Sequence, residues 1–115
     1  MRGQSFRYAW EGILAFFRAE HNAIIHLLAS IAVVCLALVF RVTKTEAIAL
    51  ILSMGFVWAT ELFNTAIEKM MDMVSTERLP EIKLIKDVSA AAVLVASFCA
   101  LLVGCIVFIP KISGS

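Results

Sequence analysis

Proline, glycine and charged residues are all scarce in this chain of 115 residues. It contains two prolines and five glycines, and charged residues make up 17% of it while hydrophobic residues make up 62%. Because a soluble globular domain usually carries about 25% charged residues, this composition excludes an ordinary soluble fold. The shortage of proline and glycine also excludes a flexible linker between domains, so we expect one domain over residues 1–115.

The three cysteines do not have the pattern of a disulfide scaffold or a metal site. Cys35, Cys99 and Cys105 all lie in apolar segments, their number is odd, and no C-x-x-C pair occurs. These features exclude a disulfide scaffold and a zinc site, and we interpret the three residues as small packing side chains. Blocks of lysine and arginine are absent as well, and the formal net charge is only +1, which argues against nucleic acid as a partner.

Long uncharged runs dominate the sequence. His21–Phe40 spans 20 residues and Val88–Pro110 spans 23 residues without Lys, Arg, Asp or Glu, and Ala47–Ile67 contains a single charge, Glu61. A membrane-spanning helix needs about 20 apolar residues. Strands of alternating polarity are absent, which excludes a barrel. We therefore expect an all-α integral membrane protein with transmembrane helices over about 22–40, 46–74 and 87–110.

The first 20 residues predict a separate amphipathic helix, over about residues 4–20. Phe6, Trp10, Ile13 and Phe17 follow one another at helical spacing and form one stripe. Such a helix can lie in the membrane interface, or its stripe can pack on the transmembrane helices, and both alternatives stay open. With three crossings, seven of the ten Lys and Arg residues fall on the side of the N-terminus, so the positive-inside rule predicts a cytoplasmic N-terminus.

Two residue types mark the expected helix ends. Thr43 or Thr45 in the short polar hairpin after the first crossing is a candidate N-cap for the second helix. Because this hairpin is short, we expect the two helices to be antiparallel neighbours. Pro80 suits the first turn of the next helix, and the charged segment 81–87 leads into the third crossing.

The second expected crossing carries an unusual polar face. Glu61, Asn64, Glu68 and Asp72 are spaced 3, 4 and 4 residues apart, which places them within about 80 degrees on a helix. A charged side chain at membrane depth costs about 2.5 to 3.5 kcal/mol on insertion scales, so Glu61 marks a candidate functional site. One face of the helix thus leads from an acid within the membrane to acids at the surface.

Further charges are expected at the same leaflet, namely Glu20 before the first crossing and Lys86 and Asp87 before the third. Mg²⁺ binds one or two carboxylates together with phosphate oxygens, and lysine offsets phosphate charge. These residues therefore suit a magnesium nucleotide, with a deeper carboxylate as general base towards a lipid hydroxyl. The glycine-rich loops G-x-x-x-x-G-K-[ST] and G-x-G-x-x-G do not occur.

Each of these residues also has a structural interpretation. Glu68, Lys69, Asp72 and Lys86 are typical of a solvated helix end, and Asn64 is typical of a contact between membrane helices. His21 and His26 are expected as interfacial anchors or as hydrogen-bonded packing residues. For Glu61, a purely structural role does not explain why the chain carries a costly charge within the membrane.

Two segments carry a resemblance to a known family. Residues 61–72 read ELFNTAIEKMMD and residues 85–94 read IKDVSAAAVL. The pattern E-x-x-N-[ST]-A-I-E-x-x-x-D, followed by K-D-x-x-x-A-A-V, resembles the prokaryotic diacylglycerol kinase family, which includes undecaprenol kinases. Tyr8–Gly12 and Glu20–Asn22 with His26 also match, so the resemblance covers essentially the whole chain.

The resemblance implies a homotrimeric lipid kinase of the bacterial inner membrane, with three transmembrane helices and an interfacial helix per chain. It implies that the γ-phosphoryl group of ATP, bound with Mg²⁺, is transferred to a lipid hydroxyl. By matching position, Glu61 is the implied catalytic base, and Glu20 and Glu68 are the implied magnesium ligands. The implied nucleotide site comprises these two acids together with Tyr8, Asn64, Glu77, Lys86 and Asp87.

The acceptor lipid stays open at this point. Diacylglycerol, giving phosphatidic acid, is the first candidate, and undecaprenol is the alternative. Ala90 falls in the segment expected to contact the lipid, where a diacylglycerol enzyme of the family has serine. The Glu20, Asn22 and His26 pattern is more similar to members outside the proteobacterial diacylglycerol enzymes.

Two other classes of protein are alternatives to a kinase. Small proton-coupled multidrug transporters have a similar length and a lone membrane glutamate, but they usually have four crossings and carry the acid in the first. A structural membrane adaptor leaves the cost of Glu61 unexplained.

Overall fold

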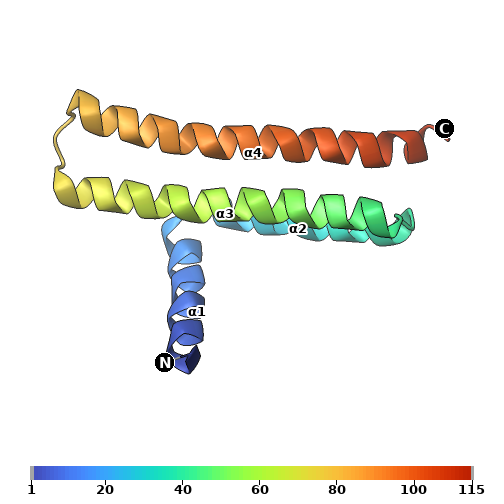
Figure 1. Ribbon diagram of the computed structural model, residues 1–115, viewed down its shortest axis with the longest axis horizontal. Coiled ribbons are helices and arrows are strands. Elements are labelled where there is room, and N and C mark those ends of the chain that lie inside the picture. The colour runs from blue at the N-terminus through green and yellow to red at the C-terminus, as the bar shows by residue number, and fades with distance from the viewer. Residues whose placement is uncertain (1, 115) are drawn as a thin grey trace.

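The computed structural model describes residues 2–114, and within this range the chain is all-helical. The helices are α1 (Arg2–Ala19), α2 (Asn22–Val39), α3 (Lys44–Val74) and α4 (Pro80–Ile112). Figure 1 shows α2, α3 and α4 side by side along the long axis, with α1 projecting away from them. Each of these three is long and apolar enough to cross a membrane, as the sequence predicted.

The turn between α2 and α3 is fixed by backbone contacts and by the side chains of Thr43 and Glu46. The Thr43 hydroxyl accepts a hydrogen bond from the backbone N–H of Glu46 at 3.2 Å, and the Thr43 N–H donates to the Glu46 carboxylate at 2.9 Å. This capping box makes Thr43, rather than Thr45, the N-cap of α3. Arg41 has a φ of 51°, and the N–H of Val42 donates to the carbonyl of Ala37, which together form a Schellman end for α2.

Helix α4 begins at Pro80, as we predicted from the sequence. Leu79 is its N-cap and Pro80 occupies the first turn, where a missing N–H costs nothing. The charged segment 81–87 is part of the same continuous helix. With 33 residues, α4 is roughly 50 Å long, against a hydrocarbon core of about 30 Å. The charged first turns can therefore extend beyond the hydrocarbon core.

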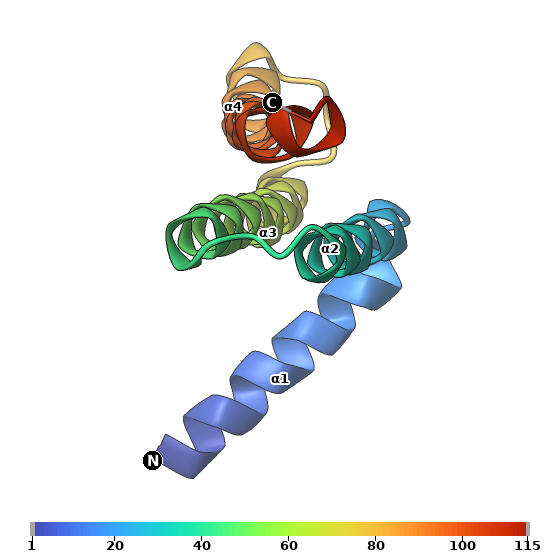
Figure 2. The ribbon, with the colours of Figure 1, turned by 90° about the vertical axis from the view of Figure 1, so that its right-hand side faces the viewer.

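Helix α3 lies between α2 and α4 and contacts both. Viewed along the long axis, α2 lies beside α3 while α4 covers another of its faces (Figure 2). At the end with the α2–α3 turn, Leu50, Val107 and Phe108 form a buried cluster. Phe40 of α2 joins it, its ring centroid 6.1 Å from that of Phe108. This cluster holds the three helices together at the end away from the polar face.

Helix α1 contacts the rest of the molecule through its C-terminal turn. Phe16 is buried, and the rings of Phe16 and Phe17 lie 6.2 and 5.8 Å from Trp58 of α3. Phe6 and Trp10 are 78% and 61% exposed. Of the two alternatives for the stripe, packing on α3 therefore holds for Phe17, whereas the earlier turns present their aromatic side chains outward.

Candidate active site

The polar face predicted for residues 61–72 is present on α3, and it forms contacts to both neighbouring helices. Glu61 contacts α2, while Asn64 and Asp72 contact α4. Glu68 lies on the same face, partly buried, without a hydrogen-bond or ion-pair partner among residues 2–114. One side of α3 therefore carries a buried acid with a single partner, Glu61, and a partly buried acid with none among residues 2–114, Glu68.

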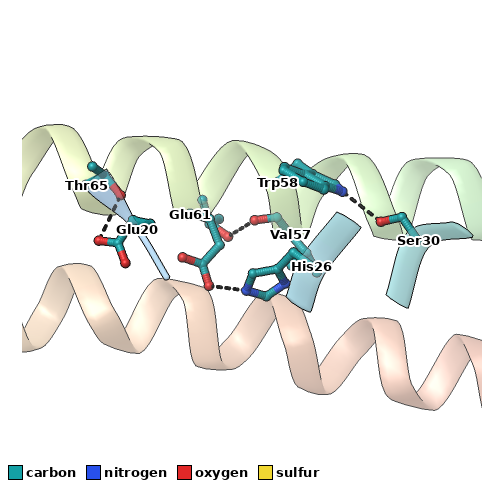
Figure 3. A network of polar contacts seen from close by, with 8 residues as sticks. Glu20, His26, Ser30, Val57, Trp58, Glu61 and Thr65 are labelled. Carbon is teal, nitrogen blue, oxygen red and sulfur yellow. Dashed lines mark hydrogen bonds and ion pairs between the residues drawn. The ribbon is translucent and has the colours of Figure 1, made fainter. Parts of the chain in front are cut away.

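Glu61 is buried within the bundle, at 9% exposure. Its Oε1 lies 2.8 Å from Nε2 of His26 on α2. A carboxylate can only accept, so the hydrogen on Nε2 is assigned to this contact. Figure 3 shows the imidazole and the carboxylate pointing toward each other across the space between the two helices. In residues 2–114 this is the only hydrogen bond to the Glu61 carboxylate, so Oε2 is left without a partner.

A second polar contact joins the same two helices one turn further along. The indole N–H of Trp58 donates to the Ser30 hydroxyl at 2.9 Å (Figure 3). His26 and Ser30 are four residues apart on α2, and Trp58 and Glu61 are three apart on α3, so each pair shares a helix face. The rings of His26 and Trp58 are 6.1 Å apart and inclined at 61°. These contacts restrain His26, the partner of Glu61, and the neighbouring Trp58.

Glu20 lies in the short break between α1 and α2, where its carboxylate turns toward α3. The hydroxyl of Thr65 donates to Oε1 of Glu20 at 3.4 Å (Figure 3). Thr65 is one turn before Glu68 on α3, which brings Glu20 to the same side of α3 as Glu68. The contact of Glu20 with α3 is thus one helical turn from Glu68, the other acid that the resemblance implies as a magnesium ligand.

Helix α4 supplies its own polar groups to α3. The Ser89 hydroxyl donates to Oδ1 of Asn64 at 2.8 Å, and Nζ of Lys86 lies 2.6 Å from Oδ1 of Asp72. Asp87 instead pairs with Lys83 on its own helix at 2.5 Å and is exposed. Of the two adjacent residues expected near the nucleotide, Lys86 therefore faces α3, whereas Asp87 is engaged along α4.

Three other predicted site residues lie outside this set of contacts. Tyr8 is 64% exposed on α1, and Glu77 is exposed in the loop between α3 and α4, where its N–H donates to the Ser75 hydroxyl at 3.0 Å. Ala90 is exposed on α4, next to Ser89. Within residues 2–114 neither Tyr8 nor Glu77 is linked to the acids of α3 by a hydrogen bond or ion pair.

Among residues 2–114 no group of three or more His, Cys, Asp or Glu side chains is arranged to hold a metal ion. Mg²⁺ with a nucleotide does not need one, because it takes one or two carboxylates and fills its remaining positions with phosphate oxygens and water. Glu20 and Glu68 supply two carboxylates on one side of α3, so the donor set fits a magnesium ion that arrives with its nucleotide.

An apolar groove starts beside the Glu61 pair. It has a volume of about 590 Å³ and is lined by α2, α3 and α4, from His26 and Trp58 at one end to Phe108 and Ile109 at the other. The lining residues of α2 run from Ile25 to Leu36, which corresponds to roughly 16 Å along the helix. The groove is long enough to hold part of a hydrocarbon chain.

Sequence reasoning missed His26, Ser89 and the Ser30–Trp58 pair as parts of the site. His26 was expected only as an anchor or a hydrogen-bonded packing residue. Its position six residues after Glu20 is visible in the sequence, but its partner on α3 depends on how two helices are placed relative to each other.

Comparison with known proteins gives consistent matches over nearly the whole chain. The sequence model of the family "Prokaryotic diacylglycerol kinase" matches residues 7–108. A diacylglycerol kinase of Synechocystis is 35% identical over 111 residues, covering 95% of this chain and 63% of that protein. An undecaprenol kinase of Bacillus subtilis is 32% identical over 109 residues, covering 95% of this chain and 89% of that protein. A diacylglycerol kinase of Pseudomonas aeruginosa is 35% identical over 89 residues, covering 77% and 72%.

Proposed function

The chain belongs to the prokaryotic diacylglycerol kinase family and is a lipid kinase with three membrane-capable helices; from that premise we propose that it transfers the γ-phosphoryl group of MgATP to a lipid hydroxyl at Glu61. The observation that carries this proposal is a buried carboxylate with one oxygen held by His26 and the other without a partner in residues 2–114. A carboxylate in that state is suited to accept a proton.

In the proposed reaction Glu61 removes the proton of the acceptor hydroxyl, whose oxygen attacks the γ-phosphorus. Phosphoryl transfer asks for little covalent chemistry from the protein, so positioning and charge stabilisation supply most of the acceleration. We assign Glu20 and Glu68 to the magnesium ion, which offsets charge on the phosphate oxygens. We assign Lys86 and Asn64, which both take part in α3–α4 contacts, to the phosphates, with Tyr8, Glu77 and Asp87 as further nucleotide contacts.

For the acceptor we propose diacylglycerol first and undecaprenol second. Both present a hydroxyl attached to long hydrocarbon chains, and the groove that begins at His26 offers apolar walls beside Glu61. The names of the Synechocystis and Pseudomonas relatives favour diacylglycerol. The chain covers 89% of the Bacillus undecaprenol kinase against 63% of the Synechocystis protein, which supports the second candidate. Ala90, exposed beside Ser89, is the position proposed to contact the lipid.

Orientation and assembly are part of the same proposal. We place the protein in the bacterial inner membrane with the N-terminus, the α3–α4 loop and the nucleotide on the cytoplasmic side, as the distribution of Lys and Arg favours. Helix α1 lies in the interface, where its exposed Phe6 and Trp10 would meet lipid. Three copies associate into a homotrimer, as the family resemblance implies.

The test is transfer of labelled γ-phosphate from MgATP to diacylglycerol and to undecaprenol, measured in parallel in mixed micelles with the Glu61→Gln variant as blank. Label in diacylglycerol alone supports the first acceptor, and label in undecaprenol alone replaces it with the second. Label in neither lipid contradicts the proposed reaction.

A further inference from the structure

We propose that His26 is a positioning residue for Glu61: it holds Oε1 so that Oε2 alone is presented to the acceptor hydroxyl. This inference rests on the proposed function, in which Glu61 is the base. The contact that carries it is the 2.8 Å hydrogen bond from Nε2 of His26 to Oε1 of Glu61. Because a glutamate side chain has three rotatable bonds, one fixed oxygen removes most of the freedom of the carboxylate.

His26 can position Glu61 because it is itself restrained. Its side chain is 24% exposed and its ring lies against Trp58, at 6.1 Å between centroids. Trp58 is fixed in turn by its hydrogen bond to Ser30 and by the rings of Phe16 and Phe17. The carboxylate is therefore oriented by a series of contacts that includes α1, α2 and α3, rather than by a mobile surface group. Figure 3 shows the α2 and α3 part of this series.

Burial makes this contact matter more than an exposed one. The Glu61 side chain is 11% exposed, so water can replace a lost donor only in part. His26 thus keeps the base oriented within the bundle.

The proton balance of the proposed step assigns His26 no transfer of its own. The O–H bond of the acceptor breaks, and its proton goes to Oε2 of Glu61. The acceptor oxygen forms a bond to the γ-phosphorus, and the bond from that phosphorus to the β–γ bridging oxygen breaks, with the electron pair leaving on ADP. The Nε2–H of His26 stays in place throughout.

The inference is tested by replacing His26 with leucine, which removes the donor, and with glutamine, whose amide N–H can reach a similar position. His26→Leu is expected to lower kcat by about 10- to 100-fold, the scale of a misplaced catalytic group, with little change in the KM for MgATP. His26→Gln is expected to recover most of that loss. The matched control is His21→Leu, because His21 is exposed at the start of the same helix and is expected to leave kcat unchanged.

Recovery by glutamine separates positioning from packing. A glutamine variant no more active than the leucine variant, or a leucine variant with wild-type kcat, would overturn the inference. Activity in Glu61→Gln would instead contradict the proposed role of Glu61, so the two failures are distinguishable.

A second readout does not depend on activity or on a folded His26 variant. In protein labelled with ¹⁵N-histidine, Glu61→Gln is expected to shift the side-chain signals of His26 while those of His21 stay in place. Unchanged His26 signals would show that the two side chains are not in contact, and would overturn the inference.

Discussion

The two ends of the α3–α4 pair are built from similar charges but use them differently. At the α2–α3 turn, Glu46 receives a hydrogen bond from Thr43 and an ion pair from Lys111 at 3.1 Å. Along the polar face of α3 that leads to the α3–α4 loop, Asp72 has one partner, Lys86, and Glu61 has one, His26, while Glu68 has none within residues 2–114. The acid at the first end therefore has two partners, whereas each acid of the polar face has one or none. The number of partners, rather than the number of charges, distinguishes the candidate active site.

Among the substitutions that test this comparison, Glu61→Gln is expected to have the largest effect on activity. The amide keeps the size but cannot accept the hydroxyl proton, so lipid phosphorylation should fall by about 10²- to 10⁴-fold, while MgATP still binds. Phosphate transfer and nucleotide binding, measured on the same preparation, check both parts. Glu46→Gln is the control at the other end and should keep the wild-type rate. Equal rates for the two variants would remove the distinction between the ends.

Glu68→Gln is expected to act through magnesium. If Glu68 is a ligand, losing its charge should raise the Mg²⁺ concentration for half-maximal activity by about tenfold or more, with activity recovering at high Mg²⁺. A magnesium titration at saturating ATP measures this. Glu11→Gln serves as control, since Glu11 is exposed on α1 and paired with Arg7. An unchanged titration would assign Glu68 to a solvated helix end.

Replacing the two lysines of the α3–α4 ion pairs is expected to have a smaller effect, seen as a difference in the KM for MgATP. Lys86→Met is expected to raise the KM for MgATP by about tenfold, or ~1.4 kcal/mol, because a phosphate contact is lost. Lys111→Met, which removes the ion pair at the other end, should leave this KM unchanged and lower the unfolding temperature in micelles. Identical KM values for both variants would make Lys86 a structural partner of Asp72 only.

The smallest effect is expected at the α2–α3 turn. Thr43→Ala removes the hydroxyl of the capping box and should lower stability by about 1 kcal/mol, without changing kcat. Thr45→Ala is the matched control, because Thr45 is exposed and is not the N-cap. Thermal unfolding in one detergent compares the two. A loss of stability in Thr45→Ala as large as in Thr43→Ala would contradict the assigned cap.

Local features of the fold were predictable from the sequence, because each depends on residues close together in the chain. The helices, the first-turn Pro80 and the polar face of α3 follow from composition and helical spacing. Thr43 and Thr45 were equivalent candidates until the geometry of the turn selected Thr43. The family resemblance then added roles that spacing alone does not give.

The contacts between helices were not predictable, because they depend on how far one helix is shifted and rotated against another. Nothing in the sequence pairs His26 with Glu61, Ser89 with Asn64 or Ser30 with Trp58. The neighbours Lys86 and Asp87 look alike as a motif, yet the first faces α3 and the second pairs with Lys83. Which of two adjacent charges faces a site is set by the rotation of the helix.

The outward-facing apolar side chains have a consequence for how this sequence can change over evolutionary time. Leu38, Val39 and Ile106 are each more than 70% exposed, and a methyl group added at any glycine from Gly3 to Gly104 would meet nothing within 4 Å. Where no neighbour within one chain contacts such a side chain, one apolar residue can replace another without disturbing a contact inside that chain. Wide stretches of α2 and α4 are therefore constrained by lipid and by the neighbouring copies of the proposed homotrimer, rather than by the fold of the single chain.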